Sequence, residues 1–246
     1  MMNKTLGVLG GLGPMSSVYF YEMLTAHTKA ARDQDHLNIM ISSKADIPDR
    51  TAYILGTSSS DPTPYMIGEV TKLINAGADL IAIPCNTAHC FYESISIASS
   101  VPVINIVRQT VKFCRYRGLR SVGVLATEGT VASGAYRSIL QMAGIDYITC
   151  DAEEQAVINH IIYGQIKKGI SPDVSEFMAV ANSLRSKGAE ALILGCTELS
   201  LIKKNELSLQ NDLFIDSLEV LAASAIKLCG KETVGFEKQL ESFDPS

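Results

Sequence analysis

Two segments of the chain have nearly the same pattern of residues. GADLIAIPCNTAHC (residues 77–90) and GAEALILGCTELS (residues 188–200) each begin with Gly-Ala and an acidic residue, continue through an apolar run, and reach a cysteine. These cysteines, Cys85 and Cys196, both stand eight positions after the first glycine, and a polar tail with a threonine follows each. A short apolar run that ends in turn-forming residues is typical of a buried strand. The repetition therefore predicts two similar structural units, each with a cysteine where a strand ends.

A second pair of segments repeats in the same order. LGVLGGLGP near the N-terminus resembles VGVLATEGT in the middle of the chain, and each reads as a strand that enters a loop of small residues. Gly7 precedes Cys85 by 78 residues, and Gly123 precedes Cys196 by 73. Strand, loop and cysteine thus recur in the same order at a similar separation. This repetition predicts two α/β halves with the same arrangement of elements.

Apolar runs alternate with helical patterns along the whole chain. We expect strands over residues 5–10, 37–42, 79–84, 102–106, 121–126, 145–149, 190–195 and 213–215. We expect helices over residues 15–31, 61–76, 128–142, 151–168, 173–187 and 216–228. Unbroken apolar strands favour parallel sheets that are covered on both faces. The alternation predicts an α/β fold with two similar half-domains, each a mainly parallel sheet flanked by helices.

The predicted halves share one cleft. We expect residues 1–107 and 216–246 to form the N-terminal half and residues 108–215 to form the C-terminal half. Ligands of open parallel sheets bind beyond the carboxyl ends of the strands. Cys85 and Cys196 both stand at such ends, so facing halves would direct both thiols into the cleft, which is the expected active site.

Composition excludes several classes of function. The net charge is −5 and no basic block appears, which argues against a nucleic-acid partner. No apolar run approaches the roughly 20 residues that a membrane helix needs, and the N-terminus lacks the features of a signal peptide. The six cysteines show no regular spacing. We expect a cytoplasmic globular protein with reduced thiols.

Two facing thiols have an evident use in proton transfer. The N-terminus of a helix lowers a thiol pKa from about 8.5, so each cysteine is expected to form a thiolate readily. Removing a proton from one face of a carbon and returning it on the other requires two such groups. Asn86, Thr87 and Thr197 follow the two cysteines and offer donors to a carboxylate in the same place.

PCNTAH and GCTEL, together with GGLGP near the N-terminus, resemble the aspartate/glutamate racemase family, which works without pyridoxal phosphate. The resemblance covers nearly the whole chain and implies that Cys85 and Cys196 are the catalytic residues, with no cofactor and no metal. It implies homodimers as well. The residues that the resemblance implies for binding the amino-acid substrate are Gly11, Leu12, Asn86, Thr87, Thr127, Thr130 and Thr197.

Three further features are similar to the aspartate racemase branch of the family. Arg50 in IPDRTAY and Lys167 in IIYGQIKKG match two cations that would hold the side-chain carboxylate of the substrate, and Lys168 is an alternative to Lys167. Glu198 is two residues after the second cysteine, at a position where glutamate racemases usually carry histidine. The resemblance favours aspartate as substrate. Glutamate or broad-specificity racemisation and another isomerisation of the superfamily, such as that of hydantoins, are alternatives.

Other interpretations of these residues explain less of the pattern. Cys90, Cys114, Cys150 and Cys229 lack the repeated context and are expected to be packing or incidental surface residues. His89 with its neighbouring cysteines supplies too few ligands for a metal site, so a structural role is expected. A two-lobed anion-binding protein without chemistry would leave the paired cysteines unexplained, and metal-dependent hydrolysis ranks below it.

Overall fold

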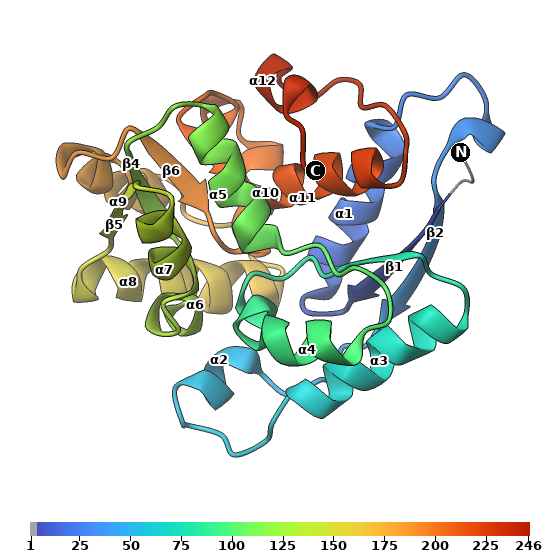
Figure 1. Ribbon diagram of the computed structural model, residues 1–246. Coiled ribbons are helices and arrows are strands. Elements are labelled where there is room, and N and C mark those ends of the chain that lie inside the picture. The colour runs from blue at the N-terminus through green and yellow to red at the C-terminus, as the bar shows by residue number, and fades with distance from the viewer. Residues whose placement is uncertain (1–3) are drawn as a thin grey trace.

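The computed structural model of the protein describes residues 4–246, and it contains two parallel sheets (Figure 1). The first sheet has the order β2-β1-β3, and the second has the order β5-β4-β6-β7. The strands are β1 (Thr5–Gly10), β2 (Asn38–Ser43), β3 (Leu80–Ala82), β4 (Ser121–Leu125), β5 (Asp146–Thr149), β6 (Ala191–Leu194) and β7 (Phe214–Asp216). Every strand pair within the two sheets is parallel. The α/β fold with two parallel sheets flanked by helices, expected from the sequence, is confirmed.

Helices connect the strands and cover the sheets. They are α1 (Pro14–Ala26), α2 (Arg50–Ile54), α3 (Thr63–Asn75), α4 (Tyr92–Ala98), α5 (Ile106–Tyr116), α6 (Glu128–Ala132), α7 (Ala135–Met142), α8 (Ala152–Asn159), α9 (Val174–Ser186), α10 (Thr197–Asn205), α11 (Ser217–Leu228) and α12 (Lys238–Ser242). Helix α11 packs against both α5 and α1, between which it lies in Figure 1.

One hydrophobic core extends through both halves of the chain. The side chains of Leu6 and Val8 on β1 and of Val122 and Val124 on β4 belong to the same buried cluster, which α11 completes. Most residues of α11 are buried because apolar side chains occur on all of its faces. The two sheets are therefore held together by shared apolar contacts. The division into residues 1–107 with 216–246 and residues 108–215 stays a prediction.

Several segments differ from the sequence-based expectation. Helices α4, α5 and α10 are additional to the expected ones, and the helix expected over 151–168 is an α-helix only over Ala152–Asn159. Two further segments differ in kind. The strand expected over 102–106 is wrong, because this segment contributes only an isolated bridge between Val103 and Ile81 before Asn105 caps α5. The helix expected over 128–142 is divided in two, because Gly134 adopts a left-handed conformation (φ 69°) between α6 and α7. Both differences arise from local turns that break an otherwise continuous apolar pattern. In the described part of the chain, residues 4–246, none of the helices has the length and hydropathy needed to cross a membrane.

Candidate active site

A small buried cavity lies where the carboxyl ends of the two sheets face each other. Cys85 and Cys196 both contribute to its wall, and each residue is 5% exposed. This inner cavity measures about 10 Å³, which is room for about one water molecule. The residues that line it are Leu12, Asp49, Arg50, Thr51, Cys85, Asn86, Thr87, Thr127, Tyr163, Lys167, Cys196, Thr197 and Glu198. The loops after β1, β3, β4 and β6 thus meet at one point, as parallel strand ends should.

Cys85 is positioned through its main chain by His89. The Nδ1 atom of His89 lies 2.8 Å from the carbonyl oxygen of Cys85, and the backbone N–H of Ile106 donates to Nε2 at 3.2 Å. Nε2 also lies 3.2 Å from the carbonyl oxygen of Ile104, but the N–H of Ile106 needs a lone pair on Nε2, so we assign the proton to Nδ1 and a neutral ring. Burial lowers the pKa of His89, which favours the same neutral form. His89 therefore has a structural role beside Cys85, as the sequence predicts.

Cys196 has different surroundings, although its place in the sequence motif is equivalent. It is the N-cap residue of α10, and its Sγ donates to Oε2 of Glu198 at 2.9 Å. Burial raises the pKa of the Cys196 thiol well above its usual value, and the negative charge of Glu198 adds to this effect. The expected lowering of the pKa by the helix N-terminus is wrong for Cys196, because desolvation and a neighbouring carboxylate outweigh it.

Three threonine hydroxyl groups form a ring that joins the two halves. Thr87 Oγ1 lies 3.0 Å from Thr127 Oγ1 and 2.9 Å from Thr130 Oγ1, and the latter two atoms are 3.0 Å apart. Thr87 follows β3, whereas the other two residues follow β4. Thr130 does not line the inner cavity; it supports the two threonines that do. Since each hydroxyl can donate or accept, Thr87 and Thr127 can direct a hydrogen to a bound carboxylate while the ring keeps their oxygen atoms in place.

Asn86 and Thr197 are held in fixed orientations. The Asn86 amide donates from Nδ2 to Ser217 Oγ at 2.9 Å, and its Oδ1 accepts from the Tyr136 hydroxyl at 2.7 Å. The Thr197 hydroxyl donates to the carbonyl oxygen of Pro84 at 3.2 Å. Both residues line the inner cavity. The Tyr136–Asn86 and Thr197–Pro84 bonds join segments from the two sheets, and together with the Asn86–Ser217 bond they fix the cavity wall.

Arg50 is a buried cation held by carbonyl groups. It is 8% exposed, and its guanidinium donates from Nη1 to the oxygen of Ile47 at 3.2 Å and from Nη2 to the oxygen of Leu12 at 3.1 Å. Among residues 4–246, no carboxylate lies within ion-pair distance of Arg50, and its Nε has no hydrogen-bond partner. A buried charge without a counter-ion is costly, so this position is suited to an anionic ligand.

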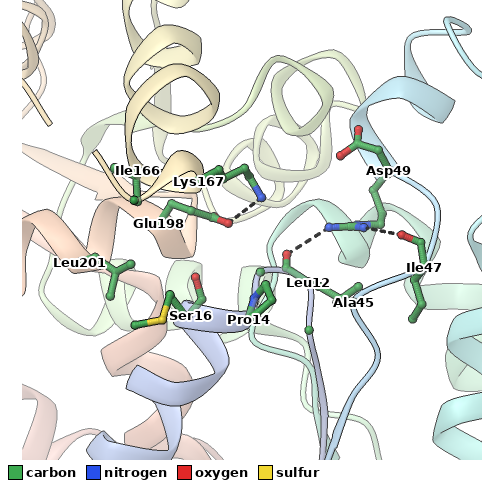
Figure 2. Close-up of a pocket in the computed structure, with 15 residues that line it drawn as sticks. Leu12, Pro14, Ser16, Ala45, Ile47, Asp49, Ile166, Lys167, Glu198 and Leu201 are labelled. Carbon is green, nitrogen blue, oxygen red and sulfur yellow. Dashed lines mark hydrogen bonds and ion pairs between the residues drawn. The ribbon is translucent and has the colours of Figure 1, made fainter. Parts of the chain in front are cut away.

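A wider cavity of about 460 Å³ adjoins the inner one. This outer cavity shares Leu12, Asp49, Arg50, Lys167 and Glu198 with the inner cavity. Gly11 lines only the outer cavity, and Lys168 lines neither. Figure 2 shows Lys167 and Glu198 facing each other across this space, with an ion pair between them.

Sequence reasoning missed several residues of the site. The sequence indicates Glu198 as a mark of the family branch and as a position that sets substrate choice, without a contact partner, and it does not indicate Asp49, Thr51 or Tyr163. Tyr163 donates to Thr51 Oγ1 at 2.8 Å, and Lys167 Nζ lies 5.5 Å from the centre of its ring. Tyr163 is one helical turn before Lys167, and this spacing would have identified it. Within residues 4–246, no group of three or more His, Cys, Asp or Glu side chains is arranged to hold a metal ion.

Comparisons with known proteins agree with this geometry. The family model described as Asp/Glu/hydantoin racemase matches residues 9–225. A broad specificity amino-acid racemase, RacX, from Bacillus subtilis is 30% identical over 231 residues, which are 90% of this chain and 96% of that protein. An aspartate racemase from Picrophilus torridus superposes with a TM-score of 0.82 at 31% identity, over 94% of this chain and 96% of the other. An aspartate racemase homologue from Pyrococcus horikoshii gives a TM-score of 0.73 at 25% identity, over 93% and 99% of the two chains.

Proposed function

The chain belongs to the Asp/Glu/hydantoin racemase family and is an amino-acid racemase, and we propose that it interconverts the enantiomers of aspartate through Cys85 and Cys196. One observation carries the proposal. Two buried thiols from equivalent strand ends line the same cavity as Arg50, a buried cation that has no carboxylate partner among residues 4–246.

The proposed reaction moves one proton from one thiol to the other through the substrate. A thiolate removes the proton from the α-carbon, and the thiol on the opposite face returns a proton. In the free enzyme Cys196 carries a proton, because it donates to Glu198. We therefore assign Cys196 as the acid in that state and Cys85 as the base. After turnover the two protonation states are exchanged, which suits a reaction that runs in both directions.

The α-carboxylate of the substrate takes up charge as the proton leaves. Donors that are already oriented stabilise this charge without further reorganisation. The hydroxyl groups of Thr87 and Thr127, which Thr130 holds in place, provide such donors at the wall of the inner cavity. Asn86 and Thr197 border the same space. We assign the α-carboxylate to this wall and the side-chain carboxylate to Arg50, which can bind it with two parallel hydrogen bonds.

A second candidate is racemisation of a broader range of amino acids. Glu198 pairs with Lys167, so one of the two cations expected to hold a side-chain carboxylate is already neutralised in the free enzyme. Similarity to a broad specificity racemase points the same way. Arg50, which lines both cavities and has no carboxylate partner among residues 4–246, favours aspartate as the first candidate.

Hydrogen–deuterium exchange tests both candidates. The enzyme is incubated in D₂O with a panel of L- and D-amino acids, and α-deuterium is measured by mass spectrometry. We expect incorporation into both enantiomers of aspartate at the highest rate. Absence of exchange into aspartate would exclude the first candidate, and comparable rates across uncharged amino acids would support the second.

Replacement of the cysteines tests the two-thiol chemistry. Cys85→Ala and Cys196→Ala are each expected to reduce racemisation by about 10⁴-fold or more, because the acid and the base act as one unit. Cys90→Ala is the matched control, since Cys90 is next to His89 in sequence and lies outside the inner cavity. Full turnover by either of the first two variants would exclude the proposed chemistry.

We propose a homodimer from the family resemblance and a cytoplasmic location from the composition, and both stay predictions. Sedimentation equilibrium of the purified chain would test the first, and a mass near the 26.5 kDa of one chain would contradict it. Cell fractionation would test the second.

A further inference from the structure

The walls of the inner and the outer cavity share one ion pair. Lys167 Nζ lies 2.7 Å from Glu198 Oε1, and both residues line both cavities. The approach is outside hydrogen-bond geometry, so the attraction is mainly between the two charges. The side chains are 27% and 7% exposed, which leaves the pair little screened by solvent. Because the inner cavity holds about one water molecule, an amino acid enters it only when side chains at this boundary move.

The two cations at this boundary differ in their freedom to move. The guanidinium of Arg50 is fixed by main-chain carbonyl groups on two segments of the chain. The ammonium of Lys167 is at the end of a flexible side chain, which can turn while the backbone stays in place. Lys167 belongs to a 3₁₀ turn that follows a π-helical turn (His160–Gln165) and ends at Gly169, whose φ is 72°. Irregular turns of this kind often occur at functional sites.

We infer that Glu198 is a specificity-determining residue that occupies Lys167 in the free enzyme and releases it to the side-chain carboxylate of the substrate. This inference rests on the proposed dicarboxylate substrate. A substrate carboxylate bound to Arg50 takes the place of the Glu198 carboxylate beside Lys167. An amino acid without a second carboxylate cannot replace the Glu198 carboxylate, so Lys167 stays paired with Glu198 when such a ligand binds. Glu198 thus makes the release of Lys167 depend on the charge of the ligand.

The N-terminal glycine motif provides the space for this exchange. A Cβ atom on Gly13 would lie 2.8 Å from Glu198 Oε1 and 3.9 Å from Lys167 Nζ. The backbone of Gly13 has φ −103°, which any residue can adopt, so the need for glycine here is one of space. The GGLGP loop therefore leaves room for the Glu198 carboxylate. The same loop provides the main-chain oxygen of Leu12 that holds Arg50.

Equilibrium binding of succinate isolates this exchange from catalysis. Succinate carries two carboxylates and no amino group, and calorimetry on the full chain measures its affinity without any proton transfer. Glu198→Gln removes the internal competitor for Lys167 and is expected to tighten succinate binding about fivefold or more. Lys167→Met is expected to weaken it. In the Lys167→Met background, Glu198→Gln is expected to leave the affinity unchanged.

Glu154→Gln is the matched control. Glu154 pairs with Lys187 at the same distance, 2.7 Å, with side chains that are 14% and 37% exposed, and it lies outside both cavities. It is expected to bind succinate as the wild type does. An unchanged or weaker affinity in a folded Glu198→Gln variant would overturn the inference, as would an equal gain in the Lys167→Met background. These outcomes are independent of deuterium exchange into aspartate, which tests the proposed function.

Discussion

Cys85 and Cys196 occupy equivalent positions in two repeated motifs, yet different neighbours surround their reactive atoms. His89 forms a hydrogen bond with the main-chain carbonyl group of Cys85, and the Cys85 side chain lines the inner cavity. The Glu198 carboxylate, in contrast, accepts a hydrogen bond from the thiol group of Cys196. A thiol that donates to a carboxylate is stabilised in its protonated form. The two cysteines are therefore equivalent in the repeated motifs, but the partners of their sulfur atoms differ.

Removing the carboxylate beside Cys196 is expected to lower the pKa of that thiol. Glu198 raises the pKa of Cys196 by charge and by accepting its proton, and Lys167 acts to lower it. In Glu198→Gln the first effect is lost and the second is no longer neutralised, so the thiolate forms at a lower pH than in the wild type. The measurement is the pH midpoint of iodoacetamide labelling at Cys196, followed by mass spectrometry. Glu154→Gln serves as the control, and an unchanged or higher midpoint in Glu198→Gln would contradict the prediction.

At the scale of elements, short helices place the functional side chains just beyond the strand ends. Asp49 caps α2 by accepting from the N–H of Ala52 at 2.7 Å, which puts Arg50 at the first position of that helix. Thr127 caps α6 in the same manner, accepting from the N–H of Thr130. An N-cap side chain fixes the direction in which the helix begins. Asp49 and Thr127 thus line the inner cavity and also fix the orientation of the helices that follow them.

Loss of the α2 cap is expected to weaken substrate binding. In Asp49→Ala the first turn of α2 loses about 1 kcal/mol of stabilisation. Because Arg50 begins that turn, the KM for aspartate is expected to rise about fivefold, with kcat changed less. Asp49→Asn keeps a capping side chain and is expected to restore KM to the wild-type value or below it. Steady-state kinetics of the two variants measure this effect, and equal values of KM in both would show that the charge of Asp49 is what matters.

At the scale of the whole molecule, the two halves are joined at the same place where the site is built. The hydroxyl ring of Thr87, Thr127 and Thr130 crosses between them, as does the hydrogen bond from Tyr136 to Asn86. The shared core cluster lies behind these contacts and includes strands of both sheets. Polar groups buried at such a junction stabilise the fold only while every one of them has a partner. Stability and site geometry are therefore coupled.

Breaking the Tyr136–Asn86 hydrogen bond is expected to destabilise the whole chain. Tyr136→Phe leaves the buried Oδ1 of Asn86 without its donor, which costs about 1–3 kcal/mol of the free energy of unfolding. Urea denaturation measures this change, and racemisation is expected to fall as well because Asn86 lines the inner cavity. Tyr65→Phe, at a tyrosine that is 52% exposed, is the control and is expected to leave both quantities unchanged. Equal stability of the two variants would contradict the prediction.

Much of the molecule could be predicted from the order of residues along the chain. Strand and helix patterns are local, so they located β1, β4 and β6 and the cysteines that follow β3 and β6. Repetition of a motif is also visible without a structure, and it indicated two α/β halves. Short helices such as α2 escaped notice because one and a half turns contain no period to detect. The break at Gly134 escaped notice because the apolar pattern continues across it.

The sequence by itself determined the α/β design and the two strand ends that carry cysteine, since both follow from patterns between near neighbours. Only the tertiary structure decided what each site residue contacts. Lys167 meets Glu198, and Thr87 meets Thr127, across separations that no local pattern encodes. These contacts depend on how the two sheets pack against each other. Packing therefore determined that Cys196 holds its proton, and that Lys167 has a partner while Arg50 has none among residues 4–246.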